Sequence, residues 1–298
     1  MISNKNIEAL IITSNVKYNP EFNKNIIASS VETKNDYFIS NIIKNIKENS
    51  NISNFLITHD LKIDNKDSLI YQDKLEDICK KEGVRLVVSP SSIKMPSQIS
   101  ATVAFKNGLK KINKDYILFW EHDHFFTKKI DWQLISDCFI NGGKMIRFNR
   151  KINKKNKAFK INKRIIDNFE IINNTEFNSK ILSTNLYSNG PFISEKKFCE
   201  RLWNNVVFEY PSWNGHFGGF IEGPVNQKML FDQFNMPKKD FINKYPIFLY
   251  GGDEALPIVH HKGRYTPQYQ IKNLSFESFI LIIKFFKQKI KKFWRYKS

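Results

Sequence analysis

Cysteine is scarce in this sequence. Cys79, Cys138 and Cys199 are the only three in the chain, and they lie far apart without a CxxC spacing. An odd number of dispersed cysteines argues against both a disulfide framework and a zinc knuckle. We therefore expect a protein of a reducing compartment, the cytoplasm.

Long apolar runs and glycine-rich phosphate loops are also missing. No segment reaches the roughly 18–20 apolar residues that span a bilayer, and residues 1–10 are too polar for a signal peptide. The sequence contains neither GxGxxG nor GxxxxGK[ST], which disfavours a dinucleotide fold with a glycine fingerprint and a P-loop NTPase. We expect a cytoplasmic protein, or one bound to a membrane from the cytosolic side.

Positive charge, by contrast, is abundant. The 298 residues carry a formal net charge of +18, which should attract nucleic acid, anionic membranes or phosphorylated substrates. Residues 150–180 hold nine Lys and Arg against three acids, and residues 271–298 hold eight against one. The first segment is typical of a solvated loop, with a nucleic-acid patch as the alternative.

The last part of the chain has the pattern of a basic amphipathic helix. Its apolar residues recur at helical spacing, and they are Phe276, Phe279, Ile280, Ile283, Phe286, Ile290, Phe293 and Trp294. Lys284, Lys291, Lys292 and Arg295 lie away from that stripe. This composition favours a helix that lies on an anionic membrane surface, and the alternative is a helix that docks on the protein's own sheet. We accordingly divide the chain into a domain of residues 1–268 and this helix, residues 269–298.

Strand and helix patterns alternate through the first half of the chain. The expected strands are residues 54–58, 84–88 and 116–120, and the expected helices are residues 36–47, 68–82 and 98–112. For the first strand, residues 8–14 and 25–31 are equally good candidates. This alternation indicates a parallel sheet built from right-handed βαβ units. Later elements are expected at residues 131–140, 144–148, 186–193, 225–234 and 246–251, with Ser194 capping a helix that runs to Trp203.

Residues 116–124 hold the most informative pattern. An apolar run typical of a buried strand ends in Glu121-His122-Asp123-His124. Open α/β sheets bind ligands at the carboxyl ends of their strands. The alternative is a strand that simply ends in a polar turn, which would have the same sequence pattern. Glu121 and Asp123 are expected on one side of the chain, where carboxylates suit Mg²⁺ or Mn²⁺. His122 and His124 should alternate to the other side and serve as supports.

Residues 98–126 resemble the central segment of GT-A-type, family-2-like glycosyltransferases. Ala104, Asn107, Gly108 and Leu109 match the family's helix, and Glu121-His122-Asp123 stands where its Asp-x-Asp-type metal motif lies. The sequence departs from the family in having Glu at the first motif position. The resemblance implies a GT-A-type, mostly parallel, Rossmann-like α/β sheet flanked by helices.

The resemblance also implies roles for residues outside that segment. Asp60 would contact the base or ribose of the nucleotide, with Ser89 and Asn107 beside the same pocket. Glu222, in a glycine- and aromatic-rich stretch, would be the general base toward the acceptor hydroxyl.

Two basic residues would complete the diphosphate site by the same resemblance. His261, with His260 as the alternative, would join Glu121 and Asp123 at the metal, and Arg264 would help to neutralise the diphosphate.

The expected activity is therefore that of a metal-dependent, inverting glycosyltransferase. It would use Mn²⁺ or Mg²⁺ and a UDP- or GDP-sugar, act on a glycan or lipid-linked acceptor, and sit peripherally on the cytosolic face of the membrane. One alternative is a nucleotidyltransferase of similar fold, although the glycine-rich basic loop of such enzymes is missing after the first strand. The other is a basic nucleic-acid-binding protein; because the charge gathers in a loop and a tail, we expect no nucleic-acid partner.

Overall fold

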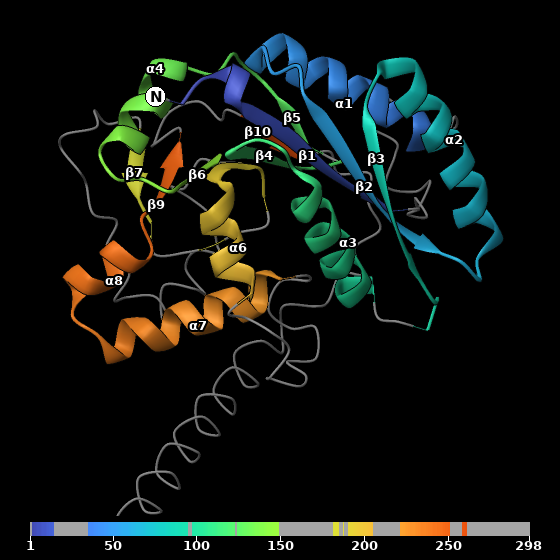
Figure 1. The fold of residues 1–298 in the computed structure, drawn as a ribbon. Helices are drawn as coiled ribbons and strands as arrows, with labels where there is room; N and C mark the ends of the chain where they lie inside the picture. Colours follow the sequence, from blue (N-terminus) through green and yellow to red (C-terminus); the bar gives the residue numbers. More distant parts are fainter. Residues whose placement is uncertain are drawn as a thin grey trace, which may run out of the picture.

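The computed structural model describes residues 2–14, 35–94, 97–122, 124–148, 181–184, 187, 190–204, 221–250 and 258–260. These residues form an eight-stranded sheet in the order β3-β2-β1-β4-β8-β6-β9-β7, together with a two-stranded ribbon of β10 and β5 (Figure 1). The strands are β1 (Ile7–Ser14), β2 (Phe55–Lys62), β3 (Arg85–Ser91), β4 (Tyr116–Glu121), β5 (His124–Phe126), β6 (Met145–Phe148), β7 (Ile181–Ser183), β8 (Phe192–Glu195), β9 (Ile247–Tyr250) and β10 (Ile258–His260). No helix among these residues has the length and apolar content needed to cross a membrane.

The first half of the sheet confirms the predicted βαβ alternation. Strands β3, β2, β1 and β4 are parallel neighbours. The helices between them are α1 (Asn35–Ser50), α2 (Lys66–Glu82) and α3 (Ser97–Lys111). The first strand is the earlier of the two candidates, while residues 25–31 lie outside the described part of the chain. The predicted α/β class with a mostly parallel sheet is thus confirmed.

The second half of the sheet is mixed. β8 is antiparallel to both β4 and β6, β9 is parallel to β6, and β7 is antiparallel to β9. The remaining helices are α4 (Trp132–Ile140), α6 (Lys196–Asn204), α7 (Glu222–Asn235) and α8 (Lys238–Lys244). These pairings place β8 between β4 and β6 in the sheet.

One prediction in this half was wrong. The strand expected at residues 186–193 is β8, which starts only at Phe192. Ser194 therefore lies in the strand and does not cap α6; its hydroxyl donates to the carbonyl of Lys144 at 2.8 Å. The apolar pair Phe192 and Ile193 is fully buried, so burial between β4 and β6 determined where the strand lies.

Two hydrophobic clusters hold helices on opposite faces of the sheet. Because side chains alternate along a strand, Ala9 and Ile11 pack with α1 and α2. Leu10 and Ile12 pack with α3, α6 and α7 on the other face. Figure 1 shows these two layers on either side of the sheet.

Helix α3 lies unusually close to the strands beneath it. A Cβ atom on Gly108 would stand 2.8 Å from Leu10 Cδ1 and 3.0 Å from Thr58 Cβ. Thr58 Oγ1 also donates to the carbonyl of Ala104 at 2.6 Å. Glycine at this position lets α3 lie close to β1 and β2 and brings Asn107 against Ser89 of β3.

At the amino ends of the strands, the buried carboxylate of Glu8 joins two strands to the chain after α3. Glu8 accepts from the guanidinium of Arg85 and, at 2.9 Å, from the backbone N–H of Asn113. The same Arg85 nitrogen donates to the carbonyl of Lys111 at 2.9 Å. This arrangement ties β1, β3 and the chain after α3 together.

Candidate functional site

Polar residues meet in one row at the carboxyl ends of the parallel strands. In the register of the sheet, Ser14 of β1 lies beside Asp60 of β2, and Asp60 lies beside Ser89 of β3. The sequence placed Asp60 and Ser89 just beyond their strands, which was wrong, because β2 continues to Lys62 and β3 to Ser91. β3 is an edge strand, so it tolerates Pro90, which cannot donate to a ladder.

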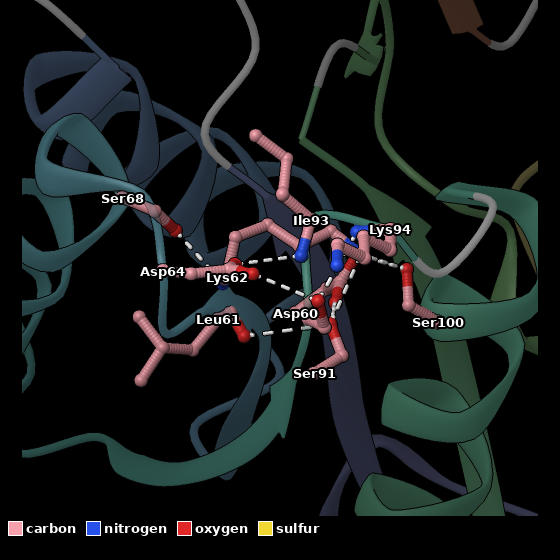
Figure 2. A network of polar contacts seen from close by, with 10 residues as sticks. Asp60, Leu61, Lys62, Asp64, Ser68, Ser91, Ile93, Lys94 and Ser100 are labelled. Atoms are coloured by element: carbon pink, nitrogen blue, oxygen red, sulfur yellow. Dashed lines mark hydrogen bonds and ion pairs between the residues drawn. The ribbon is translucent and has the colours of Figure 1, made fainter.

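Asp60 is the centre of a closed polar network, shown in Figure 2. Its Oδ1 accepts from the Ser91 hydroxyl at 2.9 Å, and its Oδ2 accepts from the Ser100 hydroxyl at 2.7 Å. The Lys62 ammonium lies 3.4 Å from Asp60 Oδ2 and donates to both serine hydroxyls. The network links β2, β3 and the first turn of α3.

The chemistry of these partners fixes the direction of each hydrogen bond. An ammonium group can only donate, so each serine hydroxyl accepts from Lys62 and donates to Asp60. Asp60 is 2% exposed, and a charge this buried requires such partners. Lys62, Ser91 and Ser100 were missed from the sequence. The signal for Lys62 was its spacing, because a residue two positions along a strand shares the same face.

A second carboxylate joins the two loops beside this network. Asp64, after β2, accepts from the Ser92 hydroxyl at 2.8 Å and from the backbone N–H of Ile93 at 2.6 Å. The Ser92 hydrogen bond, followed by that of Ile93, lowers the pKa of Asp64 below its usual value. Asp64 therefore fixes the loop that follows β3.

The structure brings two further predicted residues together. Asn107 Nδ2 donates to Ser89 Oγ at 3.0 Å. Ser89 is buried, whereas Asn107 is only partly buried. Both stand on the α3 side of the row that contains Asp60, so Asp60, Ser89 and Asn107 form one contiguous group.

The opposite face of β2 carries a buried histidine. His59 Nδ1 lies 2.6 Å from Gln72 Oε1, and Gln72 Nε2 donates to Glu76 at 2.6 Å. The amide of Gln72 therefore presents its oxygen to His59, which places the imidazole proton on Nδ1. Burial lowers the pKa of His59 below 6.5, against smaller opposing effects of Gln72 and Asp60.

Glu121 ends β4 near the same edge of the sheet. Its backbone is level with Ile12 of β1, and its side chain is 18% exposed. His124 is fully buried, with Nδ1 3.6 Å from Glu121 Oε2. The prediction that His124 points away from Glu121 was wrong. The reason is that β4 ends at Glu121 and a new strand begins at His124, so strict alternation stops between them.

The ribbon of β5 and β10 joins two segments that are far apart in sequence. His260 pairs directly opposite His124, Val259 opposite Phe125, and Ile258 opposite Phe126. The family resemblance implied that His261, or His260 as the alternative, joins Glu121 and Asp123. The backbone pairing places His260 beside His124.

Three predicted residues, Asp123, His261 and Arg264, lie outside the described part of the chain, as does the basic helix of residues 269–298. Asp123 directly precedes His124, and His261 directly follows His260. Within the described residues no three metal-competent side chains gather. Carboxylate oxygens such as those of Glu121 are nevertheless the donor type that suits Mn²⁺ or Mg²⁺.

Glu222 is the first residue of α7, not part of an irregular loop as its sequence texture suggested. Its neighbours Ile221 and Val225 pack in the same cluster as Ile117 and Phe119 of β4. Alternation along β4 directs Glu121 to that face as well. Both carboxylates thus belong to the α3–α6–α7 side of the sheet.

Comparisons with known proteins give structural matches only. No protein-family description and no curated protein matches the sequence. Similar solved structures include glucosyl-3-phosphoglycerate synthase from Mycobacterium tuberculosis in complex with Mn²⁺ and UDP-glucose, with 11% identity, 94% of this chain and 78% of that chain covered, and a TM-score of 0.47.

Two other solved structures are similar to a comparable degree. S. aureus TarS 1–349 has 9% identity, with 86% of this chain and 60% of that chain covered, and a TM-score of 0.42. The 4-diphosphocytidyl-2C-methyl-D-erythritol synthase from Anaerococcus prevotii has 11% identity, with 85% and 93% covered, and a TM-score of 0.40. Since all three scores are below 0.5, none of these matches assigns an activity to this chain.

Proposed function

We propose that this protein is a metal-dependent glycosyltransferase that uses a nucleoside-diphosphate sugar. The observation that carries the proposal is the pairing of His260 opposite His124. It brings His260 beside the segment that follows Glu121, at the carboxyl ends of the strands where Asp60, Ser89 and Asn107 lie. A metal-bound diphosphate with its nucleoside would need both groups of residues.

In this proposal the nucleoside lies against the carboxyl ends of β2 and β3. Asp60 can only accept hydrogen bonds, so it would receive an N–H of the base or an O–H of the ribose. Ser89 Oγ accepts from Asn107, so its own proton can be directed toward the ligand. The ordered network around Asp60 supports this role because it holds the carboxylate in one orientation before binding.

The diphosphate lies beside the end of β4. Glu121, Asp123 and His261, with His260 as the alternative, would hold Mn²⁺ or Mg²⁺, and Arg264 would pair with a phosphate oxygen. When bound, the cation offsets the negative charge that develops on the departing nucleoside diphosphate.

Glu222 is proposed as the general base. It would take the proton of the acceptor hydroxyl while that oxygen attacks the anomeric carbon opposite the leaving diphosphate. One such in-line displacement inverts the anomeric centre. The position of Glu222 at the start of α7, on the face to which Glu121 points, supports this assignment.

The basic segment of residues 271–298 is the basis for the proposed acceptor class and location of the enzyme. We propose that residues 271–298 bind an anionic membrane from the cytosolic side, where a glycan or lipid-linked acceptor is found. Flotation on vesicles containing phosphatidylserine tests this directly. The full chain should float, whereas a chain ending at residue 270 should stay in the dense fraction; equal recovery of the two would contradict the proposal.

The activity is tested by transfer or hydrolysis with a panel of UDP-, GDP- and CMP-sugars in Mn²⁺. Asp123→Ala and Glu222→Gln should each lose at least 100-fold in kcat/KM, which is about 2.7 kcal/mol. Asp137→Asn, an exposed carboxylate of α4 that contacts Gln133, is the matched control and should keep full activity.

Three results would contradict the proposal. One is full activity in both site variants. Another is the absence of binding for every nucleotide sugar in the presence of metal. The third is release of pyrophosphate from a nucleoside triphosphate, which would identify a nucleotidyltransferase instead.

A further inference from the structure

Among the described residues, no third strand pairs with the β5–β10 ribbon. Along a strand, the backbone N–H and C=O groups of successive residues point to opposite sides. The backbone groups of His124 and Phe126 therefore share one edge of β5, while those of Phe125 share the other. Backbone groups at such an edge need partners when they are buried, and His124 and Phe126 are buried.

Two side chains close this edge. The Asn45 carboxamide of α1 accepts from the Phe126 N–H at 2.7 Å and donates to the Phe126 carbonyl at 3.1 Å. The Trp120 indole N–H donates to the His124 carbonyl at 2.8 Å. Asn45 thus forms the two hydrogen bonds that a neighbouring strand would form, and the pattern fixes which end of its amide faces each group.

The end of α1 also holds the chain beyond β5. The Ile130 N–H donates to the carbonyl of Asn49 at 2.9 Å, and the Trp132 indole donates to the carbonyl of Ser50 at 3.0 Å. One helix end therefore fixes residues 124–132 at three points, of which only Asn45 acts on β5 through its side chain.

We infer that Asn45 is a positioning residue for the proposed metal site. It sets the position of β5, and β5 in turn determines where His124 stands relative to Glu121 and to the backbone of His260. Asn45 contacts the backbone of Phe126 and would act on the site through it. The inference rests on the proposed function, because the site that Asn45 would position is the metal site proposed above.

The short length of β5 explains why one side chain matters. β5 has three residues and pairs with three residues of β10, so few other contacts define its register. Residues that orient metal ligands from outside typically change metal affinity by about 10–100-fold. The nucleoside pocket at β2, β3 and α3 involves no contact with Asn45 in the described chain.

The test compares Asn45→Ala and Asn45→Asp with Asn49→Ala. Asn49 lies one turn later on α1, and its side chain donates to the carbonyl of Asn45 at 2.9 Å. Its substitution removes one side-chain hydrogen bond from the same helix without touching β5. Asn45→Asp keeps an acceptor for the Phe126 N–H but places a carboxylate oxygen against the Phe126 carbonyl.

Two quantities are measured for each variant. The first is the Kd for Mn²⁺ in saturating UDP, from the loss of the free Mn²⁺ signal in electron paramagnetic resonance. The second is the Kd for uridine in EDTA. Both Asn45 variants should bind Mn²⁺ at least tenfold more weakly, with uridine affinity within twofold of wild type, while Asn49→Ala should match wild type in both. Amide hydrogen exchange at Phe126 should accelerate only in the Asn45 variants.

The outcomes separate this inference from the proposed function. If wild type binds Mn²⁺ with UDP but the Asn45 variants bind it as Asn49→Ala does, the inference is overturned and the proposed function stands. A parallel loss of Mn²⁺ and uridine affinity would overturn it too, since that result indicates a general structural defect. If wild type binds no Mn²⁺ in the presence of UDP, the proposed function fails, and the role of Asn45 fails with it.

Discussion

The two ends of the parallel strands each bury a carboxylate, but they surround it differently. At the amino ends, Glu8 accepts from Arg85 and from a backbone N–H of Asn113. At the carboxyl ends, Asp60 accepts from the hydroxyls of Ser91 and Ser100 and lies beside the Lys62 ammonium. Both side chains are almost completely buried.

The difference lies in what each partner can do. The backbone N–H of Asn113 that donates to Glu8 is fixed by the course of the chain after α3. It cannot rotate toward a ligand as a side chain can. Every partner of Asp60 is a side chain that can rotate toward an incoming ligand. The amino end therefore stabilises the sheet, whereas the carboxyl end combines stability with side chains that can turn toward the proposed nucleotide.

Replacing each carboxylate with its amide gives the largest expected effects. Asp60→Asn places an NH₂ group against donors and should lower the free energy of unfolding by about 2–3 kcal/mol. It should also weaken UDP binding at least tenfold. Glu8→Gln should cost about 1–3 kcal/mol of stability and leave UDP binding unchanged. Chemical denaturation and calorimetric titration measure the two quantities, and equal losses of UDP affinity in both variants would refute the distinction.

The close approach of α3 belongs to the carboxyl-end arrangement. Gly108→Ala would place a methyl group 2.8 Å from Leu10 Cδ1. Overpacking of this kind should lower the free energy of unfolding by about 1–3 kcal/mol. Gly83→Ala is an informative contrast: it meets no atom within 4 Å but has a φ of +65°, so its cost comes from the backbone. Only Gly108→Ala should alter uridine affinity, and an unchanged affinity would show that the helix position is not critical.

His59 makes the carboxyl end sensitive to pH. Burial lowers its pKa below 6.5 in the folded protein, so the unfolded chain binds the proton more readily. Stability should therefore fall as the pH drops below about 6.5, by at most about 1.4 kcal/mol per pH unit. His59→Leu should remove this part of the slope between pH 7 and pH 5 in denaturation experiments. A variant that retains the full wild-type slope would assign the sensitivity to another group.

The smallest expected effect concerns β1. Thr13 Oγ1 lies 2.6 Å from the hydroxyl of Tyr71, on the α2 side of the sheet. Thr13→Val removes one buried hydrogen bond and should lower stability by about 0.5–1.5 kcal/mol, as measured by thermal or chemical unfolding. Since Thr13 lies on the face opposite Asp60, UDP affinity should not change; a tenfold loss would mean that the two faces are coupled.

The fold of the first half was predictable because each element has its own periodic signal. The strand at β4 and the helices α1–α3 were found from apolar spacing within short windows. The antiparallel placement of β8 was not predictable in this way, because it depends on burial between β4 and β6. Proline in β3 was misinterpreted as a strand end, since only the edge position of β3 makes it acceptable.

The sequence singled out candidate site residues beside recognisable elements. Asp60, Ser89 and Glu121 stand near the ends of predicted strands, and Asn107 lies in the predicted helix that resembles the family's. The partners of Asp60 come from three different elements, and Asn45 acts through backbone atoms of Phe126. Apart from the spacing of Lys62, these relations leave no pattern in sequence, because they depend on tertiary contacts between segments that are far apart.

The most direct test of the central claim is calorimetric titration of the wild-type protein with UDP, in Mn²⁺ and in EDTA. If the carboxyl ends of the parallel strands form a joint nucleotide and metal site, UDP should bind one-to-one, at least tenfold more tightly with Mn²⁺. Absence of binding, or an affinity that does not depend on the metal, would contradict this account.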